Sequence, residues 1–515
     1  MNTGLLIGYF LARQEAVKAS RKLKKGFRRV AWISKNAEGE IQIGKPLSQR
    51  LFFGVKKELI ENHGRWLVAG DTALILVAPI EKLRVPVSIL LESEEAIPAV
   101  FVLHPKRERP SKDRRESGFG GSLLSPNQLH EHALLLAAEH RLDPKPLRNT
   151  DLLKRLERGR EWIQRICRDL GEASHLQQSV PPTAEWLLDN EYILESNARD
   201  VRLNLPWPFY RQLPALANEN DRGLPRVYSL AHELAARTEL LVDEQNIMAF
   251  IEAYQSVASL SIGELWAVPQ MLRMALVEGI EELAGRALTE LREQEIADFW
   301  AHRLITANRR EPGQLFAIMA ELAKAYPSPS PYFASQLNDY LYDEEAAMAP
   351  VKGWLERSFQ KPLNDIILRV KNQQTRDQIS IGNAFTSLRL LAVLDWKVCF
   401  ERLSRVEAIL KKDPAGIYST MDFPTRDRYR RAIEDLRRGS GLKEEQVAER
   451  VIALAMSAHG EPALDDRLIH IGTYLIGEKR GELASLIGCR ETLRFRALHW
   501  AYRHHSSVYF IGLTF

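Results

Sequence analysis

The chain of 515 residues is poor in cysteine, nearly balanced in charge and short of long apolar runs. Its three cysteines, Cys167, Cys399 and Cys489, lie far apart and match no metal-site spacing, so we interpret them as small buried side chains in a reducing compartment. A net charge of +4 is small for this length and argues against nucleic acid as a partner. The apolar runs at 3–12 and 508–515 are each shorter than the ~20 residues that span a bilayer.

Short motifs for nucleotide binding or catalysis are also absent. We find no G-x-x-x-x-G-K-[ST], G-x-G-x-x-G, G-x-S-x-G or D-x-D. The missing D-x-D matters most, because a metal-dependent sugar-nucleotide transferase holds its diphosphate through Mg²⁺ or Mn²⁺ on closely spaced carboxylates. His130, His132 and His140 lack the H-E-x-x-H spacing of a zinc helix, so we interpret them as structural. The sequence predicts no metal and no cofactor in this chain.

The residues that are present predict a mainly α protein, with a large multi-helix, α/α array-like domain preceded by a small α/β domain. Apolar content of 45% with 27% charged residues is typical of a globular chain. We expect five segments: an apolar and basic N-terminal segment (1–26), a small α/β domain (27–105), a charged flexible linker (106–124), a helical domain (125–490) and a basic membrane-proximal tail (491–515) that begins a truncated membrane segment.

The N-terminal segment has three open interpretations. Its apolar run, 3–12, precedes a basic cluster, which fits an interfacial helix on anionic lipid, the end of a membrane segment, or a frayed solvated helix. The β-branched runs that follow within 27–105 have the length of strands. Residues 106–124 are charged and rich in Gly and Ser, so we interpret them as a solvated hinge whose basic residues could also touch lipid or phosphate.

Several helix ends are predicted by local chemistry. Ser125-Pro126-Asn127-Gln128 and Ser261-Ile262-Gly263-Glu264 both have the form of a capping box, and the prolines at 206 and 208 should end the helix that begins near Thr183. Ser261-Ile262-Gly263 recurs at 380–382, again before an apolar helix pattern. The recurrence indicates a duplicated unit with a second Ser-capped helix starting at Ser380.

Seven polar residues in or beside the apolar helix patterns are candidates for a polar network or a ligand contact: Glu264, Arg273, Arg389, Asp395, Asp422, Arg426 and Tyr429. Glu264 has the position of a capping carboxylate. We expect the next three to form buried ion pairs. The last three lie in MDFPTRDRYRR (421–431), which we interpret as a helix start fixed by salt bridges, although Arg forks also suit phosphate and aromatic faces suit sugars.

A resemblance to a known family rests on long ordered phrases. These are EWLLDNEYILESNARDVRLNLPWPFYRQLPAL (185–216), PRVYSLAHELAART (225–238), SIGELWAVPQMLR (261–273), ISIGNAFTSLRLLAVLDWKVCFE (379–401), DPAGIYSTMDFPTRDRYRRAIEDL (413–436) and HIGTYLIGEKR (470–480). They resemble the N-terminal region of bacterial cyclic β-1,2-glucan synthases, and the similarity covers about 180–490. Such enzymes are large inner-membrane glucosyltransferases that polymerise glucose from UDP-glucose and close the chain into a ring.

The resemblance implies that this chain is the cytoplasmic N-terminal part of such an enzyme, at the cytoplasmic face of the inner membrane. It would support or regulate glucan synthesis, with UDP-glucose and a divalent metal bound in catalytic domains that this chain lacks. The implied partners are the bacterial inner membrane and downstream glycosyltransferase domains or a separately encoded transferase. Two alternatives stay open: an independent carbohydrate-active α/α enzyme, and a scaffold that docks a separate transferase.

Overall fold

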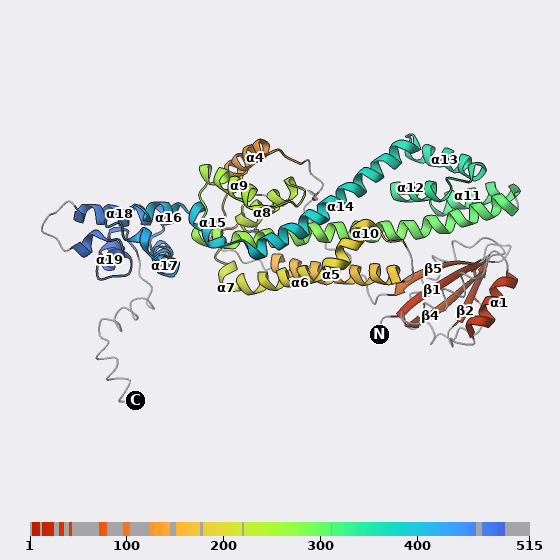
Figure 1. Ribbon diagram of the computed structural model, residues 1–515, viewed down its shortest axis with the longest axis horizontal. Helices are drawn as coiled ribbons and strands as arrows, with labels where there is room; N and C mark the ends of the chain where they lie inside the picture. The colour runs from red at the N-terminus through yellow and green to blue at the C-terminus, as the bar shows by residue number, and fades with distance from the viewer. Residues whose placement is uncertain are drawn as a thin grey trace, which may run out of the picture. The chain divides into compact units, whose positions relative to one another are not determined.

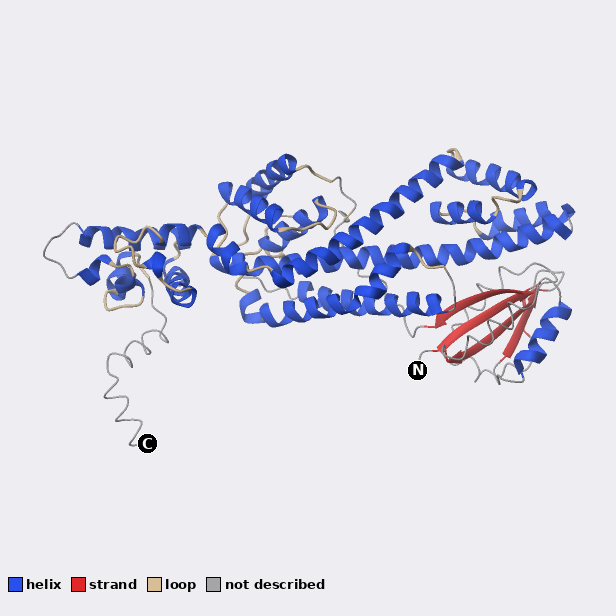
Figure 2. Cartoon of the chain, viewed as in Figure 1, coloured by secondary structure: helices blue, strands red, loops and turns tan. Residues whose placement is uncertain are grey.

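A computed structural model describes the chain over residues 3–10, 13–24, 30–35, 41–43, 72–79, 96–103, 119, 123–144, 151–175, 179–218, 221–310, 312–459 and 466–489. Most of these residues are helical (Figure 2), which confirms the predicted mainly α class. Contacts divide the chain into two compact units. Unit 1 comprises 1–119, 155–196 and 277–386, and unit 2 comprises 120–154, 197–276 and 387–515.

Unit 1 contains an antiparallel five-stranded sheet, drawn in red in Figure 2, with the order β3-β2-β4-β1-β5. Its strands are β1 (Thr3–Phe10), β2 (Val30–Lys35), β3 (Ile41–Ile43), β4 (Thr72–Pro79) and β5 (Ala96–Leu103). Helix α1 (Arg13–Lys24) follows β1 and buries Ala16, Ala19 and Leu23, which share one face at helical spacing.

The expectation for the N-terminal apolar run is corrected by this sheet. Residues 3–10 form neither an interfacial helix nor a frayed one: β1 pairs with β4 on one side, Leu6 opposite Leu76, and with β5 on the other, Leu6 opposite Val100. An eight-residue apolar run has the ordinary length of a strand, but its partners lie far downstream, where no local pattern points to them. The sheet therefore begins before residue 27. The predicted tail, 491–515, lies outside the described residues, as does most of the linker, 106–124.

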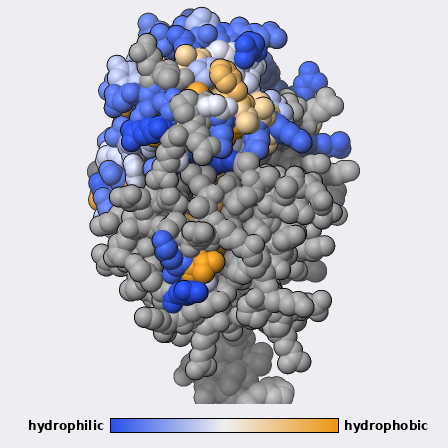
Figure 3. Space-filling view, turned by 90° about the vertical axis from the view of Figure 1, so that its right-hand side faces the viewer, coloured by the Kyte–Doolittle hydropathy of each residue, from blue (hydrophilic) through white to orange (hydrophobic). Residues whose placement is uncertain are grey.

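The helices of unit 1 are α5 (Asp151–His175), most of α6 (Pro182–Asn204), the later part of α10 (Ile262–Arg310), η4 (Pro312–Gln314), α11 (Leu315–Ala325), α12 (Pro331–Tyr340), α13 (Glu345–Phe359) and most of α14 (Leu363–Val393). Trp300, Leu322, Phe333 and Leu355 belong to one buried cluster contributed by α10, α11, α12 and α13. Figure 3 shows that the described surface at this end is largely hydrophilic, with a small apolar group.

Unit 2 is built from shorter helices, of which Figure 1 labels all but η5, η6 and α20: α4 (Pro126–Glu139), α7 (Trp207–Tyr210), α8 (Arg226–Arg237), α9 (Glu244–Val257), the start of α10, α15 (Trp396–Leu403), α16 (Arg405–Leu410), η5 (Tyr418–Thr420), α17 (Phe423–Ser440), α18 (Glu444–His459), η6 (Asp466–Ile469), α19 (Gly472–Leu475) and α20 (Arg480–Leu486). Tyr228, Phe250, Tyr254 and Phe400 are among its fully buried aromatic side chains. These short helices supply the polar groups that are described below.

Two predicted caps are present. The Ser125 hydroxyl accepts from the Gln128 N–H at 3.4 Å, and the Gln128 side chain accepts from the Ser125 N–H at 3.0 Å. The same reciprocal pair joins Ser261 and Glu264, with distances of 3.3 and 3.0 Å. Each pair satisfies two N–H groups that a helix start leaves without intrahelical partners. As predicted, α6 ends at Asn204, two residues before Pro206.

The second Ser-capped helix is a wrong prediction. Ser380 lies inside α14, which runs without interruption from Leu363 to Val393, so it starts no helix. Nothing before Ser380 stops the helix, since residues 363–379 contain neither proline nor glycine. Gly382 lies within the same helix, where the Trp186 ring comes within 3.5 Å of the position that a Cβ would take. A Cβ at this position would make only an ordinary van der Waals contact with that ring.

Candidate functional site

The densest polar cluster among the described residues surrounds Glu407 of α16, whose side chain is completely buried. Arg430 NH1 lies 2.8 Å from Glu407 Oε2, and Arg426 NH1 lies 3.1 Å from Glu407 Oε1. The Tyr418 hydroxyl donates to Oε2 at 2.7 Å, and Lys411 Nζ is 3.8 Å from Oε1. Because a buried carboxylate is costly without partners, these contacts compensate for the burial of Glu407.

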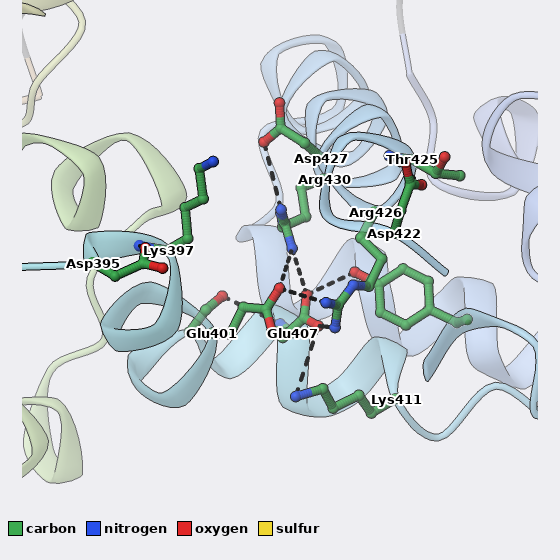
Figure 4. A network of polar contacts seen from close by, with 12 residues as sticks. Asp395, Lys397, Glu401, Glu407, Lys411, Asp422, Thr425, Arg426, Asp427 and Arg430 are labelled. Carbon is green, nitrogen blue, oxygen red and sulfur yellow. Dashed lines mark hydrogen bonds and ion pairs between the residues drawn. The ribbon is translucent and has the colours of Figure 1, made fainter. Parts of the chain in front are cut away.

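Two further carboxylates complete this cluster (Figure 4). Arg426 NH2 lies 2.8 Å from Glu401 of α15, and Arg430 NH2 lies 3.7 Å from Asp427 of α17. We call the whole set the Glu407 network: Glu401, Glu407, Lys411, Tyr418, Arg426, Asp427 and Arg430. It contains three carboxylates and three cations, so its charges balance. It joins α15, α16 and α17, which are separate in sequence.

Aromatic rings enclose the Arg430 guanidinium. The side chain is 0% exposed, and its Cζ lies 5.1 Å from the centre of the Phe400 ring and 4.6 Å from that of Phe423. Trp266 stacks on Phe400 with ring centres 4.6 Å apart. A guanidinium is weakly hydrated and is attracted to the faces of aromatic rings, which lowers the cost of burying it. Arg430 is thus fixed between rings on one side and carboxylates on the other.

A second polar chain links Asp413, His470 and Tyr429. Asp413 Oδ2 lies 2.8 Å from His470 Nδ1, and His470 Nε2 lies 2.9 Å from the Tyr429 hydroxyl. Burial alone would raise the pKa of Asp413, but hydrogen bonds from His470 and from the N–H groups of Ile471 and Tyr418 outweigh it, and the pKa lies below its ordinary value. Burial followed by the Asp413 charge raises the pKa of Tyr429.

Gly472 adjoins this chain at the start of α19. A Cβ there would overlap the Tyr429 hydroxyl and would lie 2.7 Å from His470 Nε2. Only glycine therefore lets the backbone approach the hydrogen-bonded pair so closely. This contact explains why the first glycine of the phrase HIGTYLIGEKR stands at position 472.

Glu264, a predicted candidate, is buried beside a partner that the sequence analysis missed. Arg226 Nε donates to Glu264 Oε1 at 2.8 Å and Arg226 NH2 to Oε2 at 2.6 Å, a bidentate pair. Glu264 is 0% exposed and also accepts from Ser261. Burial would lower the pKa of Arg226, but the charge and hydrogen bonds of Glu264 raise it above the ordinary value. This carboxylate both caps α10 and neutralises a buried arginine of α8.

Of the three residues expected to form buried ion pairs, only Arg273 is buried. Arg273 is buried and donates to Asn197 Oδ1 at 2.9 Å and to the Leu391 carbonyl at 2.6 Å, and burial lowers its pKa. Arg389 and Asp395 are both exposed. Asp395 is the N-cap of α15 and accepts from the Lys397 N–H at 3.0 Å. The correction has a simple reason: Asp395 lies at a helix boundary, where its carboxylate satisfies backbone N–H groups.

The three candidates from 421–431 have different positions. Asp422 is the exposed N-cap of α17 and accepts from the Thr425 N–H at 3.2 Å, whereas Arg426 belongs to the Glu407 network and Tyr429 to the chain with His470. Sequence reasoning missed Arg430, although its spacing of four from Arg426 places both on one helix face. It also missed Glu407, because no local pattern shows which helices will meet.

The described parts of the chain contain neither a cluster of metal ligands nor a helix that could span a membrane. No group of three or more His, Cys, Asp or Glu side chains there is arranged to hold a metal ion. Nor does any helix in those parts combine the length and apolar character needed to cross a bilayer. The candidate site is therefore a set of charged and aromatic side chains that contact one another.

Comparison with known proteins gives one clear relative. No protein-family model matches the chain. The chain is 31% identical over 331 residues to the cyclic β-(1,2)-glucan synthase NdvB of Rhizobium meliloti (strain 1021). The match covers 63% of this chain and 11% of the relative, so the chain spans only a small part of that protein's length. The resemblance inferred from the sequence phrases is thus confirmed: over this segment the chain is related to the cyclic β-(1,2)-glucan synthases.

Proposed function

We propose that this chain supports or regulates the synthesis of cyclic β-1,2-glucan by a membrane glucosyltransferase, and that glucose transfer takes place in other domains. The observation that carries the proposal is the 31% identity to NdvB over 331 residues. The predicted site residues that the structure describes are engaged in caps, ion pairs and hydrogen bonds within the chain. Such an arrangement favours an architectural role over a role in substrate binding.

The chemistry of the Glu407 network supports the same proposal. A nucleotide phosphate could reach Arg430 only if the cluster opened, because Arg430 and its ion-pair partner Glu407 are both completely buried. Breaking a buried pair leaves an uncompensated charge and costs about 3–5 kcal/mol. We infer that the network holds α15, α16 and α17 together as one rigid group of helices, and that it does not bind a ligand.

The proposal extends to location and partners. The chain would lie at the cytoplasmic face of the bacterial inner membrane, next to glycosyltransferase domains encoded downstream or separately. UDP-glucose and a divalent metal would bind in those domains. The helical corner of unit 2 would then position or regulate the transferase through direct contact, as a scaffold does.

A reconstitution experiment tests the proposal. The purified chain is incubated with labelled UDP-glucose and Mg²⁺ or Mn²⁺, alone and together with a cyclic glucan synthase from which the matching segment has been deleted. We expect no incorporation by the chain alone, little by the deleted synthase, and recovery when the two are combined. Robust incorporation by the chain alone, or no recovery with a folded chain, contradicts the proposal.

A further inference from the structure

We propose that the contact between α10 and α14 in unit 1 holds one proton between Glu290 and Asp377, and that loss of this proton at rising pH loosens the contact. The inference is independent of the proposed function, because it concerns a buried polar layer of unit 1, whereas the candidate site belongs to unit 2. We call this set the polar layer: Arg286 and Glu290 of α10 with Gln373, Gln374 and Asp377 of α14.

The geometry of the polar layer is specific. Arg286 Nε lies 3.1 Å from Asp377 Oδ2, and the Gln374 side chain donates to Glu290 Oε2 at 3.1 Å. The Gln373 side chain donates to Asp377 Oδ1 at 2.8 Å. Residue 286 thus meets 377, and 290 meets 374, so the two helices run antiparallel at this point. Spacings of three and four place the partners on one face of each helix.

The layer has more carboxylates than cations. Arg286 forms ion pairs with both Asp377 and Glu282, at 3.1 Å each, whereas the neutral amide of Gln374 donates to Glu290. Glu290 is 6% exposed and Asp377 is 2% exposed. Arg286 is thus shared between Asp377 and Glu282, a carboxylate outside the layer, while Glu290 is buried against an amide. Two ionised carboxylates in such a place repel each other and lose their hydration.

Binding one proton relieves both costs. A protonated carboxyl group keeps its hydrogen bonds, needs no cation and no longer repels its neighbour. Burial raises the pKa of both Glu290 and Asp377 above their ordinary values; the charge of Asp377 adds to this for Glu290, and the charge of Glu282 adds to it for Asp377. The titratable and charged groups that act on the pair are Glu282 and Arg286 of α10, Tyr332 of α12 and Arg376 of α14.

The direction of the pH effect follows from linkage. A carboxyl group whose pKa is raised on folding stabilises the protein fully below its unfolded pKa, and this stability is lost as the pH rises through the folded pKa. The α10–α14 contact is therefore firmest in acid and weakens toward alkaline pH. The strength of packing between α10 and α14 therefore depends on pH.

The test compares the full chain with Glu290→Gln. A glutamine has the same shape, accepts from Gln374 and carries no charge at any pH. The matched control is Glu161→Gln, which changes an exposed residue in the middle of α5. Urea unfolding midpoints are measured from pH 5.5 to 9. We expect the midpoint of the unmodified chain to fall with pH, the control to fall in parallel, and Glu290→Gln to fall less.

A local readout keeps the proposal falsifiable whatever the variant does. Amide hydrogen exchange, corrected for its intrinsic pH dependence, should lose protection around 286–290 and 373–377 as the pH rises in the unmodified chain. If Glu290→Gln does not fold, Asp377→Asn and carboxyl-detected NMR titration of the unmodified chain replace it. Equal pH slopes for the chain and Glu290→Gln, unchanged exchange, or ordinary pKa values for both carboxyls overturn the inference.

Discussion

The Glu407 network of unit 2 and the polar layer of unit 1 are both buried between helices, yet their charges are balanced in different ways. Around Glu407, three carboxylates face three cations, and rings enclose Arg430 (Figure 4). In the polar layer, Arg286 is shared between Asp377 and Glu282, and Glu290 receives an amide. The comparison shows that the number of neighbouring cations matters. A buried carboxylate with enough cations forms fixed ion pairs, whereas one with too few tends to bind a proton.

The largest expected effect comes from removing the central cation of the Glu407 network. Arg430→Met leaves Glu407 buried with fewer partners, and we expect a loss of about 3–5 kcal/mol in the free energy of unfolding. The matched control is Arg431→Met: its side chain is 74% exposed and pairs with Asp427, so it should cost about 1 kcal/mol or less. Urea unfolding of both variants measures the difference. Similar losses would mean that the network is no more than a solvated surface cluster.

A second variant tests the close approach of the backbone at Gly472 to the hydrogen-bonded pair of Tyr429 and His470. Gly472→Ala places a Cβ against the Tyr429 hydroxyl and His470, and we expect overpacking to cost about 1–3 kcal/mol. Gly481→Ala is the control, because nothing lies within 4 Å of its Cβ position in α20. Alanine favours helix there, so that change should be neutral or stabilising. Thermal unfolding of the two variants decides; equal midpoints count against the packing argument.

A smaller difference in stability is expected between alanine substitutions at the serines of the two Ser-Ile-Gly segments. Ser261→Ala removes a cap and should cost about 1 kcal/mol, the usual size for an N-cap. Ser380→Ala, in the middle of α14, should be neutral or slightly stabilising because alanine has the higher helix propensity. The two free energies of unfolding are compared in urea. A cost at Ser380 that matches the cost at Ser261 would restore the idea of two equivalent caps.

The smallest expected effect is a change in the pH dependence of stability. It tests whether unit 2 also contains a carboxylate with too few neighbouring cations. Burial, followed by the charge of Glu444, raises the pKa of Glu434 to about 7. The stability that this group contributes is therefore lost as the pH rises from its unfolded pKa through about 7. Glu434→Gln should remove that loss, with a gain of about 1 kcal/mol or less at pH 8 once solvent screening is considered. Unfolding at pH 5 and pH 8 measures it, with the more exposed Asp435→Asn as control, which should behave like the unmodified chain.

Local chemistry could be predicted from the sequence, whereas partnerships between distant segments could not. The boxes at Ser125 and Ser261 and the end of α6 were readable, because a cap depends on residues within one turn. Ser380 shows the limit of the same reasoning: the same Ser-Ile-Gly motif starts no helix there, because the preceding residues already form one. The pairing of Arg226 with Glu264 spans 38 positions and needs the fold before it can be seen.

The candidate site divides along the same line. The assignment of Asp422 to a helix start required only the sequence Asp-Phe-Pro-Thr, and the structure places it there as an N-cap. Arg389 and Asp395 were expected inside apolar helix patterns but lie on the exposed side or at the end of a helix. Helical periodicity does not show which face a long helix turns to its neighbours when several helices compete for it.

The place of β1 in the sheet has a consequence for the order in which the protein folds. This strand is synthesised before the rest of the sheet, yet its two neighbours are β4 and β5, and the second is complete only at Leu103. Until β4 and β5 have been synthesised, the backbone groups on both edges of this apolar strand have no strand partners. Unpaired strand edges of this kind promote aggregation. Trimming the first ten residues would therefore not shorten a tail: it would remove the strand that joins β4 to β5 and leave the nascent sheet in two pieces.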